Sequence, residues 1–199
     1  MSRRIVVFHP AGLGDAVMDL ALLRSVSASH DGPPILWVTS PYGPTVLRAA
    51  GLEGAVRPVV TGRGVGSTLG LLPRGCGRAD VLAIPGGMNL RRLTPLVRLL
   101  RPRRAGGAIP DHPGECVAAV RPRAGVFEVV VGPVEGLHRV ALDARLGEAL
   151  GLTRRTGSPR LRPARERRSG LAVVHHGAAP GDDAKRLPLP AWKPLLEAL

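Results

Sequence analysis

The feature that most constrains the fold of this chain is the alternation of short apolar runs with longer segments of helical periodicity. Residues 3–8 end in an apolar run, and the segment at 15–30 carries apolar side chains three and four positions apart, as an amphipathic helix does. The alternation continues with strand-like runs at 34–39, 55–60, 79–85, 104–109 and 126–131 and helix-like segments at 43–51, 90–101 and 136–152. Strands that alternate with helices predict an α/β fold with a mostly parallel, doubly wound, Rossmann-like sheet.

Three of the strand-like runs, at 3–8, 35–39 and 81–84, are nearly continuous in apolar residues. Parallel strands that are buried on both faces have this pattern. We therefore expect these three to be neighbouring parallel strands with helices on both faces of the sheet. In the segment at 90–101 we expect Pro95 to interrupt the helix, because proline lacks the backbone N–H.

The alternation stops near residue 153. Residues 153–170 are rich in arginine, proline and glycine and lack apolar periodicity, which is typical of a linker or a solvated surface segment. Residues 171–199 then begin a second strand-and-helix unit, which is too short to bury a core of its own. We expect a domain at 1–152, a linker at 153–170 and the beginning of an incomplete second domain at 171–199.

The formal net charge of +13 comes almost entirely from arginine, because Lys185 and Lys193 are the only lysines among 199 residues. This excess reflects either a compositional bias or an anionic partner, such as a phosphorylated lipid surface or a nucleotide. Nucleic acid is the least favoured of the anionic partners. The chain has only five aromatic residues for base stacking, and its basic residues are scattered.

The sequence contains no signal for export or membrane insertion. No apolar run approaches the roughly 20 residues that cross a bilayer, and the apolar stretch at 5–8 is too short for a signal peptide, so we expect a cytoplasmic protein. Cys76 and Cys116 are too few for a disulfide framework and lack metal-ligand spacing. His175 and His176 are adjacent, so on a strand they point to opposite faces. We expect no metal ion or other cofactor.

A glycine-rich turn with the sequence PAGLGDAVMD joins the first predicted strand to the first predicted helix. Such a turn usually binds an anion through backbone N–H groups and the helix dipole, which an acid at Asp15 would repel. Gly12 and Gly14 have the spacing of a dinucleotide fingerprint, but Val17 replaces its third glycine. Asp15 is therefore either a helix cap or a group that handles a proton. His9, beside this turn, either contacts substrate or is solvated.

The longer segment GLGDAVMDLALLRSV resembles the opening of glycosyltransferase family 9, the bacterial heptosyltransferases. Three later segments resemble parts of that family in the same order: PGGMNLRRLTPLVRLLRPRRAGG, LHRVALDARLGEALGL and VVHHGAAPGDDAKRLPLPAWKPLLEAL. The chain departs from the family at Arg139, which is displaced from the usual arginine position, and at Leu187, which replaces a tryptophan. It has no counterpart of the family's later acidic motif before Leu199.

The resemblance implies a GT-B glycosyltransferase with an acceptor lobe at 1–152 and an incomplete nucleotide-sugar lobe at 171–199. It further implies inverting transfer from a nucleotide-activated sugar, such as ADP-heptose, to an anionic lipid-linked or cell-envelope saccharide. This reaction belongs to lipopolysaccharide biosynthesis and would bring the protein into peripheral contact with the inner face of the cytoplasmic membrane. In the family the acid after the glycines is the catalytic base, and Asp15 occupies the matching position.

The remaining candidate residues would bind either the acceptor or the donor of the predicted reaction. Glycines allow an acceptor to approach the backbone closely, and two polar residues follow the fourth predicted strand, so the acceptor-binding candidates are Gly12, Gly14, Asn89 and Arg91. By the resemblance, the candidates for binding the donor phosphates are Lys185, Arg186 and Gly177.

Two other functions stay open. The chain is also consistent with a catalytically incompetent fragment or binding module of that family, or with another nucleotide-dependent Rossmann-like enzyme. Because the donor lobe is incomplete, we expect the 199-residue chain alone to bind nucleotide sugar weakly and to transfer sugar poorly.

Overall fold

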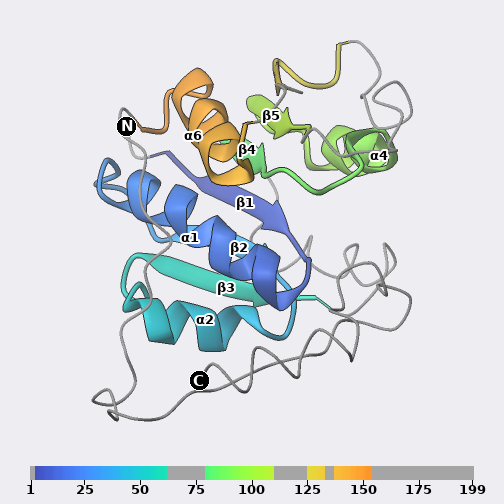
Figure 1. The fold of residues 1–199 in the computed structure, drawn as a ribbon. Coiled ribbons are helices and arrows are strands. Elements are labelled where there is room, and N and C mark those ends of the chain that lie inside the picture. Colours follow the sequence, from blue (N-terminus) through green and yellow to red (C-terminus); the bar gives the residue numbers. More distant parts are fainter. Residues whose placement is uncertain (1–2, 62–78, 110–124, 133–136, 154–199) are drawn as a thin grey trace, which may run out of the picture. The chain divides into compact units, whose positions relative to one another are not determined.

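Six strands form one all-parallel sheet in the part of the chain that the computed structural model describes, namely residues 3–61, 79–109, 125–132 and 137–153 (Figure 1). The strands are β1 (Ile5–His9), β2 (Ile35–Thr39), β3 (Val56–Val60), β4 (Val81–Ile84), β5 (Arg104–Ala108) and β6 (Val129–Val131). Their order in the sheet is β3-β2-β1-β4-β5-β6. This is the order of a doubly wound, Rossmann-like sheet, so the predicted fold class is confirmed.

Strand β1 lies in the middle of the sheet, between β2 and β4. Val7 on β1 is in register with Trp37 on β2 and with Ala83 on β4, and both pairings are parallel. Every residue of these three strands is buried. The expectation that these apolar runs are neighbouring parallel strands is confirmed.

Helices cover both faces of this sheet (Figure 1). The described helices are α1 (Leu13–Ser27), α2 (Gly43–Ala50), α4 (Leu90–Leu100) and α6 (Arg139–Ala149). One core cluster combines apolar side chains of α1, α2 and α6 with Trp37 of the sheet. A second cluster combines side chains of α4 with Phe8 and Leu82, which belong to the opposite face. The apolar face of each helix therefore closes one of two cores on the two sides of the sheet.

The sheet contains a topological switch point at the carboxyl ends of β1 and β4. From β1 the chain proceeds outward through β2 to β3, and β4 then lies on the other side of β1. In open α/β sheets, ligands bind at the carboxyl edge where the strand order reverses in this way. The turns that follow β1 and β4 are therefore the first place to look for a functional site.

Two helices differ in detail from the sequence expectation. Helix α1 begins at Leu13 with Gly12 as its N-cap, so Asp15 lies within the first turn and does not cap the helix. Helix α4 runs continuously through Pro95, and the expected interruption is wrong. The proline removes one backbone hydrogen bond, whereas the helix buries a full apolar stripe against the sheet, formed by Leu90, Leu93, Leu96, Val97 and Leu100.

Strand β5 is held close to the helices on both faces by two adjacent glycines. A Cβ on Gly106 would lie 2.9 Å from side-chain atoms of Leu146 and Leu150 on the α6 side. A Cβ on Gly107 would lie 2.6 Å from the side chain of Leu90 on α4. Because these distances are shorter than van der Waals contact, the bare backbone is what allows both helices to pack at this depth.

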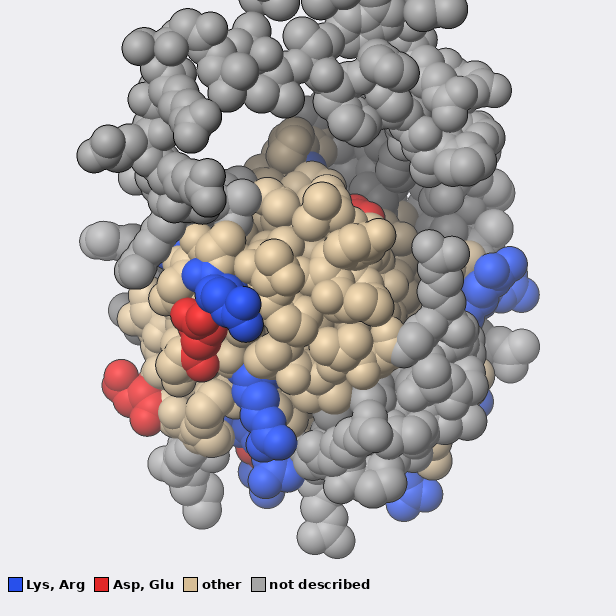
Figure 2. All heavy atoms as spheres, turned by 90° about the horizontal axis from the view of Figure 1, so that it is seen from below, with Lys and Arg blue, Asp and Glu red and all other residues tan. Residues whose placement is uncertain are grey.

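The surface gives no sign that the positive charge is concentrated on the face shown in Figure 2. Most of the described surface there belongs to residues other than Lys, Arg, Asp and Glu, and the basic side chains do not gather into a patch.

Among the described helices, none combines the length and apolar character needed to cross a membrane. Residues 154–199, with the predicted donor-binding residues Lys185, Arg186 and Gly177, lie outside the described residues, as do both cysteines.

Candidate active site

The candidate site lies at the switch point, where three elements meet. The end of β1 supplies His9, the turn after it supplies Gly12, and the first turn of α1 supplies Asp15. The turn after β4 supplies Gly86 and Gly87, and α6 supplies side chains that reach both turns. Parallel strands bring the two turns to one edge of the sheet.

Arg139 is the centre of this site, because its guanidinium bonds three carboxylates. Its Nη1 donates to Oδ1 of Asp15, and its Nη2 donates to Oδ1 of Asp19 at 2.5 Å. Its Nε donates to Oδ2 of Asp143 at 3.2 Å. The side chain of Arg139 is 9% exposed, those of Asp19 and Asp143 are 0% exposed, and that of Asp15 is 38% exposed. Of the three carboxylates, Asp15 is the one that solvent reaches.

Asp19 contacts side chains from three different elements. The His9 ring nitrogen Nδ1, at the end of β1, lies 2.8 Å from Oδ1 of Asp19, and Trp37 Nε1 on β2 donates to its Oδ2 at 3.3 Å. Nη2 of Arg139 on α6 donates to Asp19 and also lies 2.9 Å from Nδ1 of His9. The other ring nitrogen of His9, Nε2, is buried and has no hydrogen-bond partner among the described residues. A buried carboxylate that is contacted from three elements is a rigid anchor for the arginine.

Asp143 links α6 to the turn after β4. The backbone N–H of Gly86 donates to Oδ1 of Asp143 at 2.7 Å. Burial raises the pKa of the Asp143 carboxyl to about 6, although the Arg139 guanidinium and the Gly86 hydrogen bond act in the opposite direction. Two further neighbours, Asp19 and His9, raise and lower that pKa respectively. Desolvation of Asp143 thus outweighs the neighbouring groups that lower its pKa.

Both oxygens of Asp15 adjoin a glycine. A Cβ on Gly12 would lie 3.6 Å from Oδ2, and a Cβ on Gly87 would lie 3.9 Å from Oδ1 and 3.5 Å from Nε2 of His9. Gly87 has a φ of 103°, which side chains other than glycine adopt only with strain. Gly12 has a φ of −67° and a ψ of 175°, which any residue adopts. The backbone conformation of the turn therefore does not require glycine at position 12. The absence of a side chain at Gly12 leaves the Asp15 carboxylate uncovered.

The other predicted acceptor-binding residues lie near this edge with less direct roles. Gly14 lies in the first turn of α1, where a Cβ would meet nothing within 4 Å. Asn89 is the N-cap of α4, and its side-chain oxygen accepts from the N–H of Arg92 at 3.1 Å. Arg91 is exposed in the first turn of the same helix. Capping accounts for the Asn89 side-chain oxygen, and the acceptor-binding role of these residues stays a prediction.

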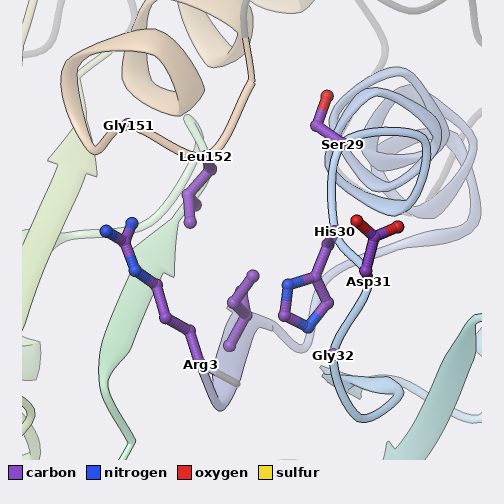
Figure 3. Close-up of a pocket in the computed structure, with 8 residues that line it drawn as sticks. Arg3, Ser29, His30, Asp31, Gly32, Gly151 and Leu152 are labelled. Carbon is purple, nitrogen blue, oxygen red and sulfur yellow. The ribbon is translucent and has the colours of Figure 1, made fainter. Parts of the chain in front are cut away.

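A separate pocket lies at the opposite edge of the sheet, around the start of β1 (Figure 3). It has a volume of about 380 Å³ and is lined by Arg3, His30, Asp31 and Leu152, among others. Arg3 and His30 border it from opposite sides (Figure 3), but the Nε2 atom of His30 is 3.1 Å from the carbonyl oxygen of Pro33. Ligands of open α/β sheets bind at the carboxyl edge, so the Asp15 edge is the candidate site.

Comparison with solved structures assigns the fold. A glycosyl transferase family 9 protein from Veillonella parvula superposes with a TM-score of 0.58 at 16% identity, over 83% of this chain and 47% of that one. This chain has the fold of glycosyltransferase family 9. The E. coli heptosyltransferase WaaC, solved with ADP, has the same fold, with a TM-score of 0.52 at 16% identity over 79% of this chain and 51% of WaaC. WaaC with ADP-2-deoxy-2-fluoro heptose gives a TM-score of 0.51 at 15% identity.

The family 9 fold of this chain spans about half the length of the structures that it matches. No protein-family model and no curated protein matches the sequence. The GT-B fold class predicted from the sequence is thus supported by three-dimensional similarity and by strand order.

Sequence reasoning missed most of the residues that surround Asp15 in this fold. The sequence suggests a loop position for His9, but it is the last residue of β1 and is 1% exposed. Sequence patterns do not mark Asp19 and Asp143 as site residues, although each follows a run of three apolar residues in a helical segment. An acid at a position that the helical period assigns to the core is a usable signal, because buried acids require a partner.

Proposed function

We propose that this chain is part of a glycosyltransferase of the family 9 type and that it carries the catalytic base. The proposed reaction is inverting transfer of a sugar from a nucleotide-activated donor to a hydroxyl of an anionic lipid-linked or cell-envelope saccharide. The observation that carries the proposal is the position of Asp15. It is a partly exposed carboxylate at the switch point of a sheet with the fold of family 9, and glycines border both of its oxygens.

In this mechanism Asp15 removes the proton from the attacking acceptor hydroxyl. An aspartate carboxylate is ionised at neutral pH and can accept that proton. The acceptor oxygen forms a bond to the anomeric carbon as the bond from that carbon to the donor phosphate breaks. The electron pair of the broken bond leaves with the nucleoside diphosphate, and inversion follows because attack and departure occur on opposite faces of the sugar. Gly12 and Gly14 leave room for the acceptor, and Asn89 and Arg91 lie beside it.

The donor is proposed to be an ADP-heptose-like nucleotide sugar. The proposal is supported by the resemblance of the sequence to heptosyltransferases and by the fold shared with WaaC, a heptosyltransferase solved with ADP and with an ADP-heptose analogue. Cationic groups are needed to stabilise the departing diphosphate. We assign this role to Lys185 and Arg186, with Gly177 providing close backbone approach, in a donor-binding unit proposed to begin at residue 171 after a linker at 153–170. The acceptor lobe is proposed to comprise residues 1–152.

Replacement of Asp15 by asparagine tests the proposal. The experiment uses a version of the protein with a complete donor lobe, ADP-heptose and a set of phosphorylated lipid-linked saccharides. It measures ADP release for turnover and uses calorimetry for donor binding. A general base contributes roughly 10²–10⁴-fold to rate. We therefore expect Asp15→Asn to reduce turnover by about a hundredfold or more, with donor affinity nearly unchanged. Equal turnover by the variant and the wild-type protein would exclude Asp15 as the base.

A further inference from the structure

Arg139 bonds three carboxylates, and two of them, Asp19 and Asp143, are also bonded by other groups. Asp19 also receives one hydrogen bond from Trp37 and contacts His9, and Asp143 receives one from the Gly86 backbone. Both of these carboxylates are buried.

Asp15 has no such additional support. Among the described residues, Arg139 is the only hydrogen-bond partner of its side chain. The carboxylate that is proposed to react is therefore held in place by Arg139 alone. Arg139 in turn is immobilised by Asp19 and Asp143, because a guanidinium with two buried, charge-assisted bonds has little freedom to move.

We propose that Arg139 is a positioning residue for the base, an inference that rests on the proposed function of Asp15. Nη1 of Arg139 holds Oδ1 of Asp15, so that Oδ2, the oxygen beside Gly12, is the atom that receives the acceptor proton. Arg139 needs no contact with substrate for this role. Its planar guanidinium donates to three carboxylates at once, Asp15 and Asp19 on α1 and Asp143 on α6. A lysine ammonium cannot reproduce this planar set of donors.

Three variants separate positioning from a purely structural role. Arg139→Lys keeps the positive charge but not the planar set of donors. The double variant Arg139→Gln with Asp143→Asn removes the cation together with one buried negative charge, so the formal charge of the cluster is unchanged. Arg145→Gln is the matched control, because Arg145 is an exposed arginine on the same helix.

Crystal structures of the variants give a readout that does not depend on activity. We expect the Asp15 carboxylate to change rotamer or to occupy two conformations in both Arg139 variants and to stay in its wild-type position in Arg145→Gln. An unmoved Asp15 carboxylate in both Arg139 variants would overturn the inference.

Kinetics test the same inference through the reaction. We expect Arg139→Lys to lower kcat for sugar transfer by about tenfold or more while KM for ADP-heptose stays within about twofold, as for an interaction that acts on the chemical step. An unchanged kcat would refute the positioning role. If the wild-type protein with a complete donor lobe transfers no sugar, the proposed function fails, and the crystal structures still decide whether Arg139 positions Asp15.

Discussion

Arg139 on α6 donates a hydrogen bond to Asp15 on α1, a residue that lies 124 positions earlier in the chain. The pair joins the first helix of the described fold to the last one, at the edge where β1 and β4 end. Arg139 also bonds two buried acids, Asp19 and Asp143. Of its three carboxylate partners, only Asp15 is reached by solvent. The experiments below test the parts of this arrangement separately.

The pKa of Asp143 makes the stability of the fold depend on pH. That pKa is raised from 3.8 to about 6 in the folded protein, so the folded state binds this proton more tightly than the unfolded chain. The stabilising effect of the proton is complete below about pH 4 and is lost as the pH rises through about 6. A shift of about two units corresponds to about 3 kcal/mol of unfolding free energy.

Replacement of Asp143 by asparagine isolates this effect. In urea unfolding from pH 4 to pH 8, we expect the wild-type protein to lose up to about 3 kcal/mol relative to Asp143→Asn as the pH rises. Asp31→Asn is the control, because Asp31 is exposed. A stability difference between the wild-type protein and Asp143→Asn that is the same at every pH would contradict the raised pKa.

A methyl group at position 12 tests whether access to Asp15 matters. The backbone of Gly12 is one that alanine adopts without strain, but alanine is a poorer N-cap than glycine, which opposes the gain of about 0.4–1 kcal/mol that a Gly→Ala replacement otherwise gives. The added Cβ lies 3.6 Å from Oδ2 of Asp15, in the path proposed for the acceptor. We expect Gly12→Ala to raise the acceptor KM or lower kcat by about tenfold, while the stability changes by no more than about 1 kcal/mol. Gly54→Ala, in an exposed turn with open space around it, is the control, and full activity of Gly12→Ala would argue against this path.

The two roles of Asn89 are separable by substitution. Asn89→Ala removes the N-cap of α4 and is expected to cost about 1 kcal/mol of stability, whereas Asn89→Ser retains a capping oxygen. Thermal unfolding measures the first role. If the side-chain amide also binds the acceptor, both variants raise the acceptor KM, because neither retains the amide. A normal acceptor KM in Asn89→Ser would limit Asn89 to the capping role.

Removal of Asp19 is expected to cost more stability than any other single change at the site. Asp19→Ala takes the common hydrogen-bond partner from His9, Trp37 and Arg139. Loss of one partner of a buried ion pair typically costs about 3–5 kcal/mol. Denaturant unfolding of Asp19→Ala and Asp31→Ala provides the comparison, since an exposed acid is expected to contribute within about 0.5 kcal/mol of zero. Similar stability of the two variants would show that Asp19 is not the anchor described above.

Local patterns predicted much of the fold because strands buried on both faces have no alternative to continuous apolar runs. The runs at 3–8, 35–39 and 81–84 became β1, β2 and β4, next to one another and parallel. Helix α4 shows where a local rule fails. Pro95 costs one backbone bond in any context, but only the packed sheet supplies the apolar contacts that keep the helix continuous around it.

The sequence by itself determined the order of strands and helices, the glycine-rich turn and the presence of an acid within it. These features depend on residues that are close together in the chain, and their periodicity and turn chemistry are visible there. Only the tertiary structure decided what surrounds Asp15, because His9, Asp19, Arg139 and Asp143 come from separate elements. Strand order brings those elements to one edge of the sheet, and desolvation there makes each buried charge require a partner.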